Sequence, residues 1–254
     1  MINIENVTKK FGDKIAVDDI SCKLNDGEII GYIGPNGAGK TTTLKMICGI
    51  MEPDNGSITL NGKDISKEPM EAKRTFGFIP DNPDVFLALK GREYVNFICN
   101  IYDVPMEVRE ERLTELLRDF EMEDAIDSKI ESYSHGMRQK IHIVATLMHD
   151  PDIWIMDEPM TGLDPRSAYL LKERMRIHAE KGNTVLFSTH VLDTAERLCD
   201  RIIIIDKGKI RYNGTLEALK DKNSDMTLEE IFLSMTGALK DDKGESAREH
   251  GVEK

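Results

Sequence analysis

Short apolar segments alternate with longer amphipathic segments along the chain. The apolar segments are rich in β-branched residues and predict strands at residues 2–7, 28–33, 153–156, 184–188 and 201–205. Apolar residues three and four positions apart predict helices at residues 91–102, 106–120 and 137–148. Because the later strands are short, continuously apolar and followed by turn or helix signals, they are typical of buried parallel strands. The pattern therefore predicts an α/β fold.

The predicted helices gather in the middle of the chain. We expect residues 82–150 to form a helical lobe inserted into an α/β core that comprises residues 1–81 and 151–220. These are two lobes rather than two independent domains. Residues 221–254 contain a predicted short helix at 228–235 and a nearly all-polar tail from residue 240, which we expect to be frayed and to which we assign no chemistry.

Composition places the chain among globular proteins. Hydrophobic residues make up 40% and charged residues 31% of 254 positions, which excludes a fibre or a wholly disordered chain. No apolar run approaches the roughly 20 residues that span a bilayer. The first residues include several charged side chains instead of the long apolar core of a secretory signal. We therefore expect a cytoplasmic chain, with any membrane role supplied through a partner.

Net charge and cysteine spacing exclude two further classes. The formal net charge of −12 argues against a general nucleic-acid binder, because phosphate backbones attract basic surfaces. The cysteines at positions 22, 48, 99 and 199 lack the paired short spacing of a zinc site. We expect all of them to be small core residues and expect no nucleic-acid partner.

A glycine-rich segment follows the predicted strand at 28–33 and opens a helix. It fits the pattern G-x-x-x-x-G-K-[ST] at every fixed position. Its glycines let backbone N–H groups converge on phosphate oxygens, helped by the positive end of the helix. Lys40 would reach the β- and γ-phosphates, and the Thr41 hydroxyl would ligate Mg²⁺. The residues expected to bind nucleotide here are Gly34, Pro35, Asn36, Gly37, Ala38, Gly39, Lys40, Thr41 and Thr42.

Two carboxylates end the apolar strand at 153–156. Asp157 is the candidate magnesium residue, because a phosphate-binding loop needs a carboxylate at the end of a neighbouring strand. Glu158 could polarise a water for in-line attack on the γ-phosphate. The alternative is a solvated acidic turn, although such turns seldom end a strand this apolar.

His190 follows the predicted strand at 184–188, after the polar residue Thr189. Ligands of open α/β folds collect at the carboxyl ends of the strands, so His190 is a candidate sensor of the γ-phosphate and a candidate catalytic residue. A lone histidine at such a place is more often structural. Only the geometry can decide between the two.

Taken in order, these features resemble the nucleotide-binding subunit of ATP-binding cassette (ABC) transporters over about residues 1–220. The segment Tyr133–Gln139 is similar to the family's signature segment and leads into the helix before Asp157. The resemblance implies a P-loop ATPase core with a parallel sheet, N-terminal antiparallel strands and an inserted helical subdomain. It also implies that ATP and Mg²⁺ are bound.

The same resemblance implies a head-to-tail dimer with two sandwiched ATP molecules. Ser134 and the Gly136 N–H would contact the γ-phosphate of the opposite subunit. Asp164 matches the loop that communicates across the dimer. Phe11 matches the aromatic residue that stacks on adenine, although an aromatic before Gly12 could equally be a core plug.

Three departures from the family pattern stand out. Asp81 replaces a glutamine that ligates the metal and senses the membrane subunit. A carboxylate can still bind Mg²⁺ but adds a negative charge. The affinity for the metal and the coupling to the membrane subunit at this position are therefore left undetermined by the sequence. His135 and Met137 replace the usual glycine and glutamine of the signature segment. Phe11 replaces a tyrosine and loses only a hydroxyl.

Within the family, Asp81, the Ser-His-Gly-Met variant and the ending at 228–233 resemble bacterial exporters of drugs, antibiotic peptides or ions. The resemblance implies an ATPase that powers export through a separate multi-span membrane permease, held peripherally on the inner face of the cell membrane. Phe86, Leu87 and Leu89 are candidates for the permease contact, with ordinary packing as the alternative. The second ATPase subunit could be another copy or a paralogue.

Two other functions compete with export. A soluble ABC ATPase of DNA repair, translation or cluster assembly usually carries coiled-coil arms, zinc cysteines or two cassettes, none of which occurs in this sequence. A GTPase would need the Asn-Lys-x-Asp pattern, and Asn61-Gly62-Lys63-Asp64 has the wrong spacing. The transported compound is not specified by this chain.

Overall fold

Two β-sheets form the centre of the molecule. The computed structural model describes residues 1–224 and 226–237. The larger sheet has the strand order β10-β9-β3-β8-β7-β6, and the smaller has the order β2-β1-β4-β5. The larger sheet contains β3 (Ile29–Ile33), β6 (Phe76–Ile79), β7 (Ile153–Asp157), β8 (Thr184–Thr189), β9 (Arg201–Asp206) and β10 (Lys209–Thr215). The smaller sheet contains β1 (Ile2–Phe11), β2 (Lys14–Leu24), β4 (Asn55–Leu60) and β5 (Lys63–Asp64).

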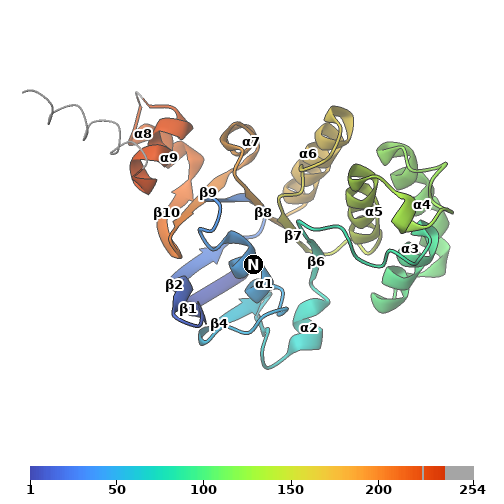
Figure 1. Cartoon of the computed structure of the whole chain (residues 1–254), viewed down its shortest axis with the longest axis horizontal. Coiled ribbons are helices and arrows are strands. Elements are labelled where there is room, and N and C mark those ends of the chain that lie inside the picture. The colour runs from blue at the N-terminus through green and yellow to red at the C-terminus, as the bar shows by residue number, and fades with distance from the viewer. Residues whose placement is uncertain (225, 238–254) are drawn as a thin grey trace, which may run out of the picture.

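Helices cover the sheets and extend the molecule at both ends. They are α1 (Lys40–Ile47), α2 (Pro69–Lys73), α3 (Gly91–Ile101), α4 (Met106–Phe120), α5 (His135–Met148), α6 (Pro165–Glu180), α7 (Leu192–Leu198), α8 (Leu216–Asp221) and α9 (Leu228–Thr236), with a 3₁₀ turn at Ile130–Ser132. Figure 1 shows α3, α4 and α5 together at one end, while α8 and α9 lie at the other. No helix within residues 1–224 and 226–237 is long and apolar enough to cross a membrane.

The pairing of the strands confirms the predicted α/β fold. β6, β7, β8, β3 and β9 pair in parallel, and only β10 is antiparallel to its neighbour. Every residue of β3, β7 and β8 is buried, because both faces of this sheet are covered. The smaller sheet is antiparallel throughout, as the resemblance implied.

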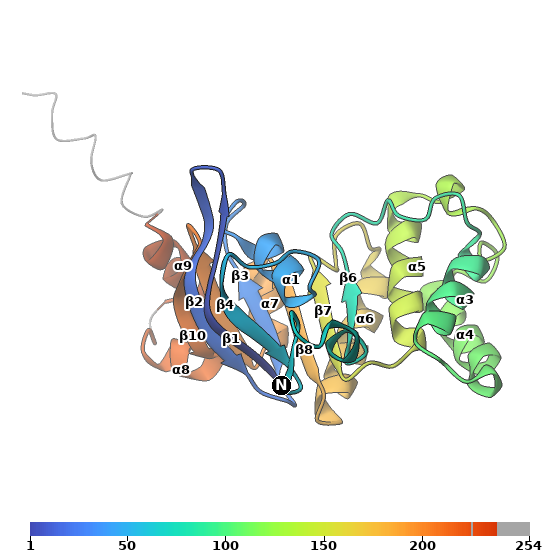
Figure 2. The ribbon, with the colours of Figure 1, turned by 90° about the horizontal axis from the view of Figure 1, so that it is seen from below.

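Two apolar clusters hold the layers together. One joins both sheets to α1 and includes Ile4, Leu44 and Ile203. The other joins the opposite face of the larger sheet to α3, α4, α5 and α6, and includes Phe120 and Phe187. Figure 2 shows the smaller sheet on one side of the larger sheet and the helices α3–α5 beyond its β6 edge. The predicted core cysteines are all buried and free.

The three predicted helices of the middle segment are confirmed as α3, α4 and α5, with bounds that agree within two residues. They lie between β6 and β7 in the chain, where the helical lobe was predicted. The predicted helix at 228–235 is α9, whose capping box joins Thr227 to Glu230. The polar tail from residue 240 lies outside the described residues.

Candidate nucleotide-binding site

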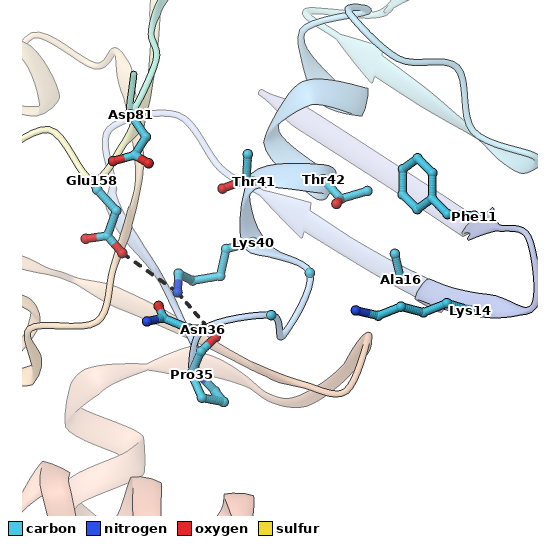
Figure 3. A pocket seen from close by; sticks show the side chains of 12 residues that line it. Phe11, Lys14, Ala16, Pro35, Asn36, Lys40, Thr41, Thr42, Asp81 and Glu158 are labelled. Carbon is cyan, nitrogen blue, oxygen red and sulfur yellow. Dashed lines mark hydrogen bonds and ion pairs between the residues drawn. The ribbon is translucent and has the colours of Figure 1, made fainter. Parts of the chain in front are cut away.

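A cavity opens beside the loop between β3 and α1. Its volume is about 350 Å³. It is lined by Phe11, Lys14, Ala16, Pro35, Asn36, Gly37, Gly39, Lys40, Thr41, Thr42, Asp81 and Glu158 (Figure 3). The fold thus brings most of the predicted phosphate-binding loop together with an aromatic ring, an acidic residue from the end of β6 and one from the end of β7. Lys14 and Ala16, on β2, were not predicted, and nothing in their sequence context marks them.

The loop needs its glycines for two separate reasons. Gly37 and Gly39 have positive φ angles of 78° and 113°, which side chains with a Cβ rarely adopt. A Cβ on Gly34 would come within 2.5 Å of the Ile205 carbonyl oxygen. Close packing on β9 and left-handed turns therefore shape the path by which the chain enters α1.

The N-terminus of α1 is suited to an anion. Gly39 is its N-cap and supplies no side-chain cap, and the first turn contains no acidic residue. The first N–H groups of a helix have no partner within the helix and carry a partial positive charge. Together with the preceding loop, they fit the phosphate groups of a nucleotide.

Lys40 is folded back over this loop. Its residue is only 7% exposed, and its Nζ donates to the carbonyl oxygens of Gly34 at 2.8 Å and Pro35 at 3.4 Å. The same Nζ lies 3.7 Å from Oε1 of Glu158, as the dashed lines of Figure 3 show. The ammonium group is therefore held by two carbonyl oxygens and a carboxylate in the lining of the cavity.

Glu158 connects Lys40 to the predicted histidine. Its Oε1 lies 3.0 Å from Nδ1 of His190, and its side chain is 14% exposed. Its backbone has a positive φ of 47° and its N–H donates to Oγ of Ser188 at 3.0 Å. The solvated acidic turn is thus excluded, because Glu158 is mostly buried and paired. His190 is 57% exposed and stands beside Glu158 but does not line the cavity, so its role as a sensor of bound phosphate stays a prediction.

Asp157 is 1% exposed and accepts a hydrogen bond of 2.5 Å from Ser188. Ser188 therefore holds both members of the acidic pair, a role that the sequence analysis did not assign to it. Partial burial raises the pKa of Asp81, and the nearby charges of Asp157 and Glu158 raise it further.

The predicted metal residues offer only oxygen donors. Thr41 and Asp81 line the cavity, and Asp157 lies at the end of β7. In the described part of the chain, no three His, Cys, Asp or Glu side chains gather closely enough to hold a metal by themselves. This set fits Mg²⁺, which usually takes one or two protein oxygens and completes its shell with water and substrate phosphates.

The predicted residues Ser134, Gly136 and Asp164 do not line the cavity. Ser134 is the N-cap of α5 and accepts a hydrogen bond from the Met137 N–H, whereas Asp164 is the N-cap of α6. Gly136 lies against the Gly162 carbonyl oxygen, which a Cβ at position 136 would approach to 2.5 Å. The contact of Ser134, Gly136 and Asp164 with a nucleotide therefore stays a prediction that requires a second subunit.

Phe11 lies at the end of β1 and is 49% exposed. A core plug would be buried, so the exposure of this ring on the cavity wall excludes that alternative. Stacking on adenine stays a prediction.

Comparisons with known proteins agree with this geometry. The family model described as "ABC transporter" matches residues 17–161. The chain is 36% identical over 246 residues to the ABC-type transporter ATP-binding protein EcsA of Bacillus subtilis, covering 96% of this chain and 98% of that relative. It is 34% identical over 241 residues to a Nod factor export ATP-binding protein I of Burkholderia orbicola, covering 95% and 79%.

Solved structures give the same result. A structure of an ATP-binding subunit of an ABC transporter superposes with a TM-score of 0.88 at 34% identity, covering 93% of this chain and 99% of that one. A dimeric ATP-binding cassette in a post-hydrolysis state, bound to ADP and Pi, gives a TM-score of 0.77 at 26% identity, covering 85% and 99%.

Proposed function

The chain belongs to the ABC transporter family as an ATP-binding ATPase subunit, and from this premise we propose that it powers export of a substrate through a separate membrane permease. The observation that carries the proposal is the single cavity that joins the phosphate-binding loop, Lys40 and Glu158. The relative named for Nod factor export supports the direction of transport. The cargo class proposed from the resemblance is a drug, an antibiotic peptide or an ion.

Each side chain of the cavity has a role in this proposal. The loop and the first turn of α1 bind the phosphates, and Lys40 exchanges the Gly34 and Pro35 carbonyls for phosphate oxygens. Glu158 accepts a proton from the attacking water, while His190 contacts the γ-phosphate from the side of Glu158. Phe11 stacks on the adenine ring.

Thr41, Asp81 and Asp157 are the residues that would hold Mg²⁺. When bound, the metal neutralises charge on the phosphate oxygens. Asp81 adds a negative charge where a glutamine is usual, and its pKa is raised by its burial first and then by the neighbouring carboxylates Asp157 and Glu158.

We also propose a head-to-tail dimer, with a second copy or a paralogue as the partner. Ser134, Gly136 and Asp164 lie outside the cavity of their own subunit, so they can reach a nucleotide only across an interface. The dimeric structural relative supports this arrangement.

We propose that the permease binds an exposed aromatic surface formed by Phe86 and Phe97, near the helices α3–α5. Phe86 is 46% exposed and its ring centroid lies 5.6 Å from that of Phe97, itself 42% exposed. Leu87 and Leu89 instead pack against the core, as the packing alternative predicted. Binding there would hold the chain at the inner face of the membrane.

Affinity purification from gently solubilised membranes tests the proposal. We expect a multi-span membrane protein to accompany the tagged native chain and the Met106→Asp variant, whose exposed residue lies on α4. The Phe86→Asp variant should lose that protein while it still hydrolyses ATP, because Phe86 lies outside the cavity. Recovery of soluble proteins or nucleic acid alone would instead favour a soluble ABC ATPase of DNA repair, translation or cluster assembly.

A further inference from the structure

The first two turns of α5 lie against the loop that joins β7 to α6, residues 158–164. Nε2 of Gln139 donates to the Pro159 carbonyl at 3.4 Å. A Cβ on Gly162 would come within 2.5 Å of Cδ2 of His135. The helix therefore contacts the beginning and the middle of the 158–164 loop, and nothing larger than glycine fits at the closest approach.

The end of the loop is held by an ion pair between the buried Lys140 and the partly exposed Asp164. Nζ of Lys140 lies 2.7 Å from Oδ2 of Asp164, and the Lys140 side chain is only 10% exposed. In the described ranges 1–224 and 226–237, Asp164 is the one carboxylate that forms an ion pair with Lys140. A lysine ammonium taken out of water needs a charged partner, so this contact constrains both elements.

Asp164 also begins α6. Its Oδ1 accepts from the Ser167 N–H at 2.9 Å, and its Oδ2 accepts from Oγ of Ser167 at 2.8 Å. The Lys140 ammonium and the Ser167 donors hold the pKa of Asp164 below its usual range. The carboxylate thus stays charged and joins α5, the 158–164 loop and α6 at one point.

Glu158 stands at the other end of the same loop. Its carbonyl accepts from the Thr161 N–H at 3.0 Å, and its backbone is in the left-handed region that a glutamate seldom adopts. Because the anchor at Asp164 is only six residues away, a shift of the loop changes the backbone that aims the Glu158 carboxylate.

We propose that Lys140 is a positioning residue for ATP hydrolysis, which acts by holding Asp164 and thereby fixing the 158–164 loop and Glu158 against α5. This inference rests on the proposed function, because it assigns the catalytic base to Glu158. Lys140 itself does not line the cavity. Its substitution therefore changes the rate of the reaction and leaves the binding of nucleotide to the loop and α1 intact.

The test measures kcat and KM for ATP hydrolysis by the full chain. Lys140→Met removes the charge at similar length, and we expect kcat to fall about tenfold while KM changes less than about twofold. Lys140→Arg keeps a cation opposite Asp164 and should recover most of kcat. Lys220→Met removes a lysine from another ion pair, 2.8 Å from Glu196, and serves as the matched control with native kcat.

A double-mutant cycle separates positioning from general destabilisation. Asp164→Asn keeps a side chain that caps α6 but loses the charge. If the pair acts as one unit, Lys140→Met with Asp164→Asn lowers kcat no more than the worse single variant. A native kcat in Lys140→Met, an equal loss in Lys140→Arg, or additive losses in the double variant would each overturn the inference.

Glu158→Gln measured in parallel distinguishes this inference from the proposed function. We expect that variant to bind ATP and to lose nearly all turnover, because the proton acceptor is gone while the loop and Lys40 remain. Undiminished hydrolysis by Glu158→Gln would remove Glu158 from the catalytic role. An inactive Glu158→Gln beside a fully active Lys140→Met would refute the positioning role alone.

Discussion

At the scale of single residues, the Lys40 ammonium in the cavity has protein partners that the phosphates of a nucleotide can replace. Lys40 is nearly buried, yet its partners are two carbonyl oxygens and a carboxylate 3.7 Å away. A phosphate oxygen is a stronger partner for an ammonium than a carbonyl oxygen is, because both members of the new pair are charged. The side chain therefore needs only a local rotation to meet the substrate.

Substitution of Lys40 tests this exchange. We expect Lys40→Ala to weaken ATP binding by about 1.5–3 kcal/mol, the usual value of a hydrogen bond to a charged group. The measurement is an equilibrium titration of ATP, with Lys220→Ala as a control on a distant helix. Unchanged affinity in Lys40→Ala would contradict the role of Lys40.

At the scale of elements, most buried strands were predicted and most exposed ones were missed. β3, β7, β8 and β9 are buried almost throughout because both of their faces are covered, and each contains a run of apolar residues that the sequence shows. β2 and β10 lie at sheet edges and expose residues at alternate positions, so neither contains the continuous apolar run by which the buried strands were found. α6 was also missed, although Leu171, Met175 and Ala179 give it a buried stripe at helical spacing.

The contact of α6 with β7 predicts a pH dependence of stability. His178 on α6 stacks on Trp154 of β7 at 4.1 Å between ring centroids, and burial lowers the pKa of His178 to about 4. Protonation below the unfolded pKa of about 6.5 therefore favours the unfolded chain. Stability should fall as the pH drops from about 6.5 towards 4, by at most about 1.4 kcal/mol per pH unit for this group.

Urea unfolding between about pH 7.5 and about pH 5, a range above the main carboxylate titrations, measures this dependence. His149, stacked on Tyr102, has a pKa lowered by burial to about 4, so it also makes the free energy of unfolding depend on pH. The free energy of unfolding of His178→Gln should change less steeply with pH than that of the native chain. An equal dependence on pH in both proteins would exclude His178 as a cause of it.

At the scale of the whole molecule, the proposed dimer uses two separate regions of each subunit. The cavity carries the phosphate-binding loop, whereas Ser134 begins α5 outside it. A helix N-terminus that begins with a serine, whose hydroxyl hydrogen can be donated, suits a phosphate of a second subunit. The proposed dimer therefore joins unlike surfaces of two copies, and each interface completes two sites.

Ser134 gives a test of that dimer. In a Glu158→Gln background with ATP, we expect a dimer by size exclusion with light scattering. Ser134→Asp keeps the N-cap but places a negative charge opposite the γ-phosphate, so dimer formation should weaken at least about tenfold. Ser134→Asn caps the helix without the charge and is the matched control. Equal dimer formation by both variants would contradict the contact.

The sequence by itself determined the family, the glycine-rich loop that enters a helix, and the position of the acidic pair at the end of a strand. These depend on residues adjacent in the chain, where glycine torsions, strand burial and helix initiation act locally. Only the tertiary structure decided that Phe11 is exposed on the cavity wall, that Glu158 meets Lys40 and His190, and that Lys140 pairs with Asp164. The ion pairs among them join residues 24 to 118 positions apart in the chain, and strand order and helix packing set them. No local pattern encodes such distances, because they arise when the sheet and α5 pack together.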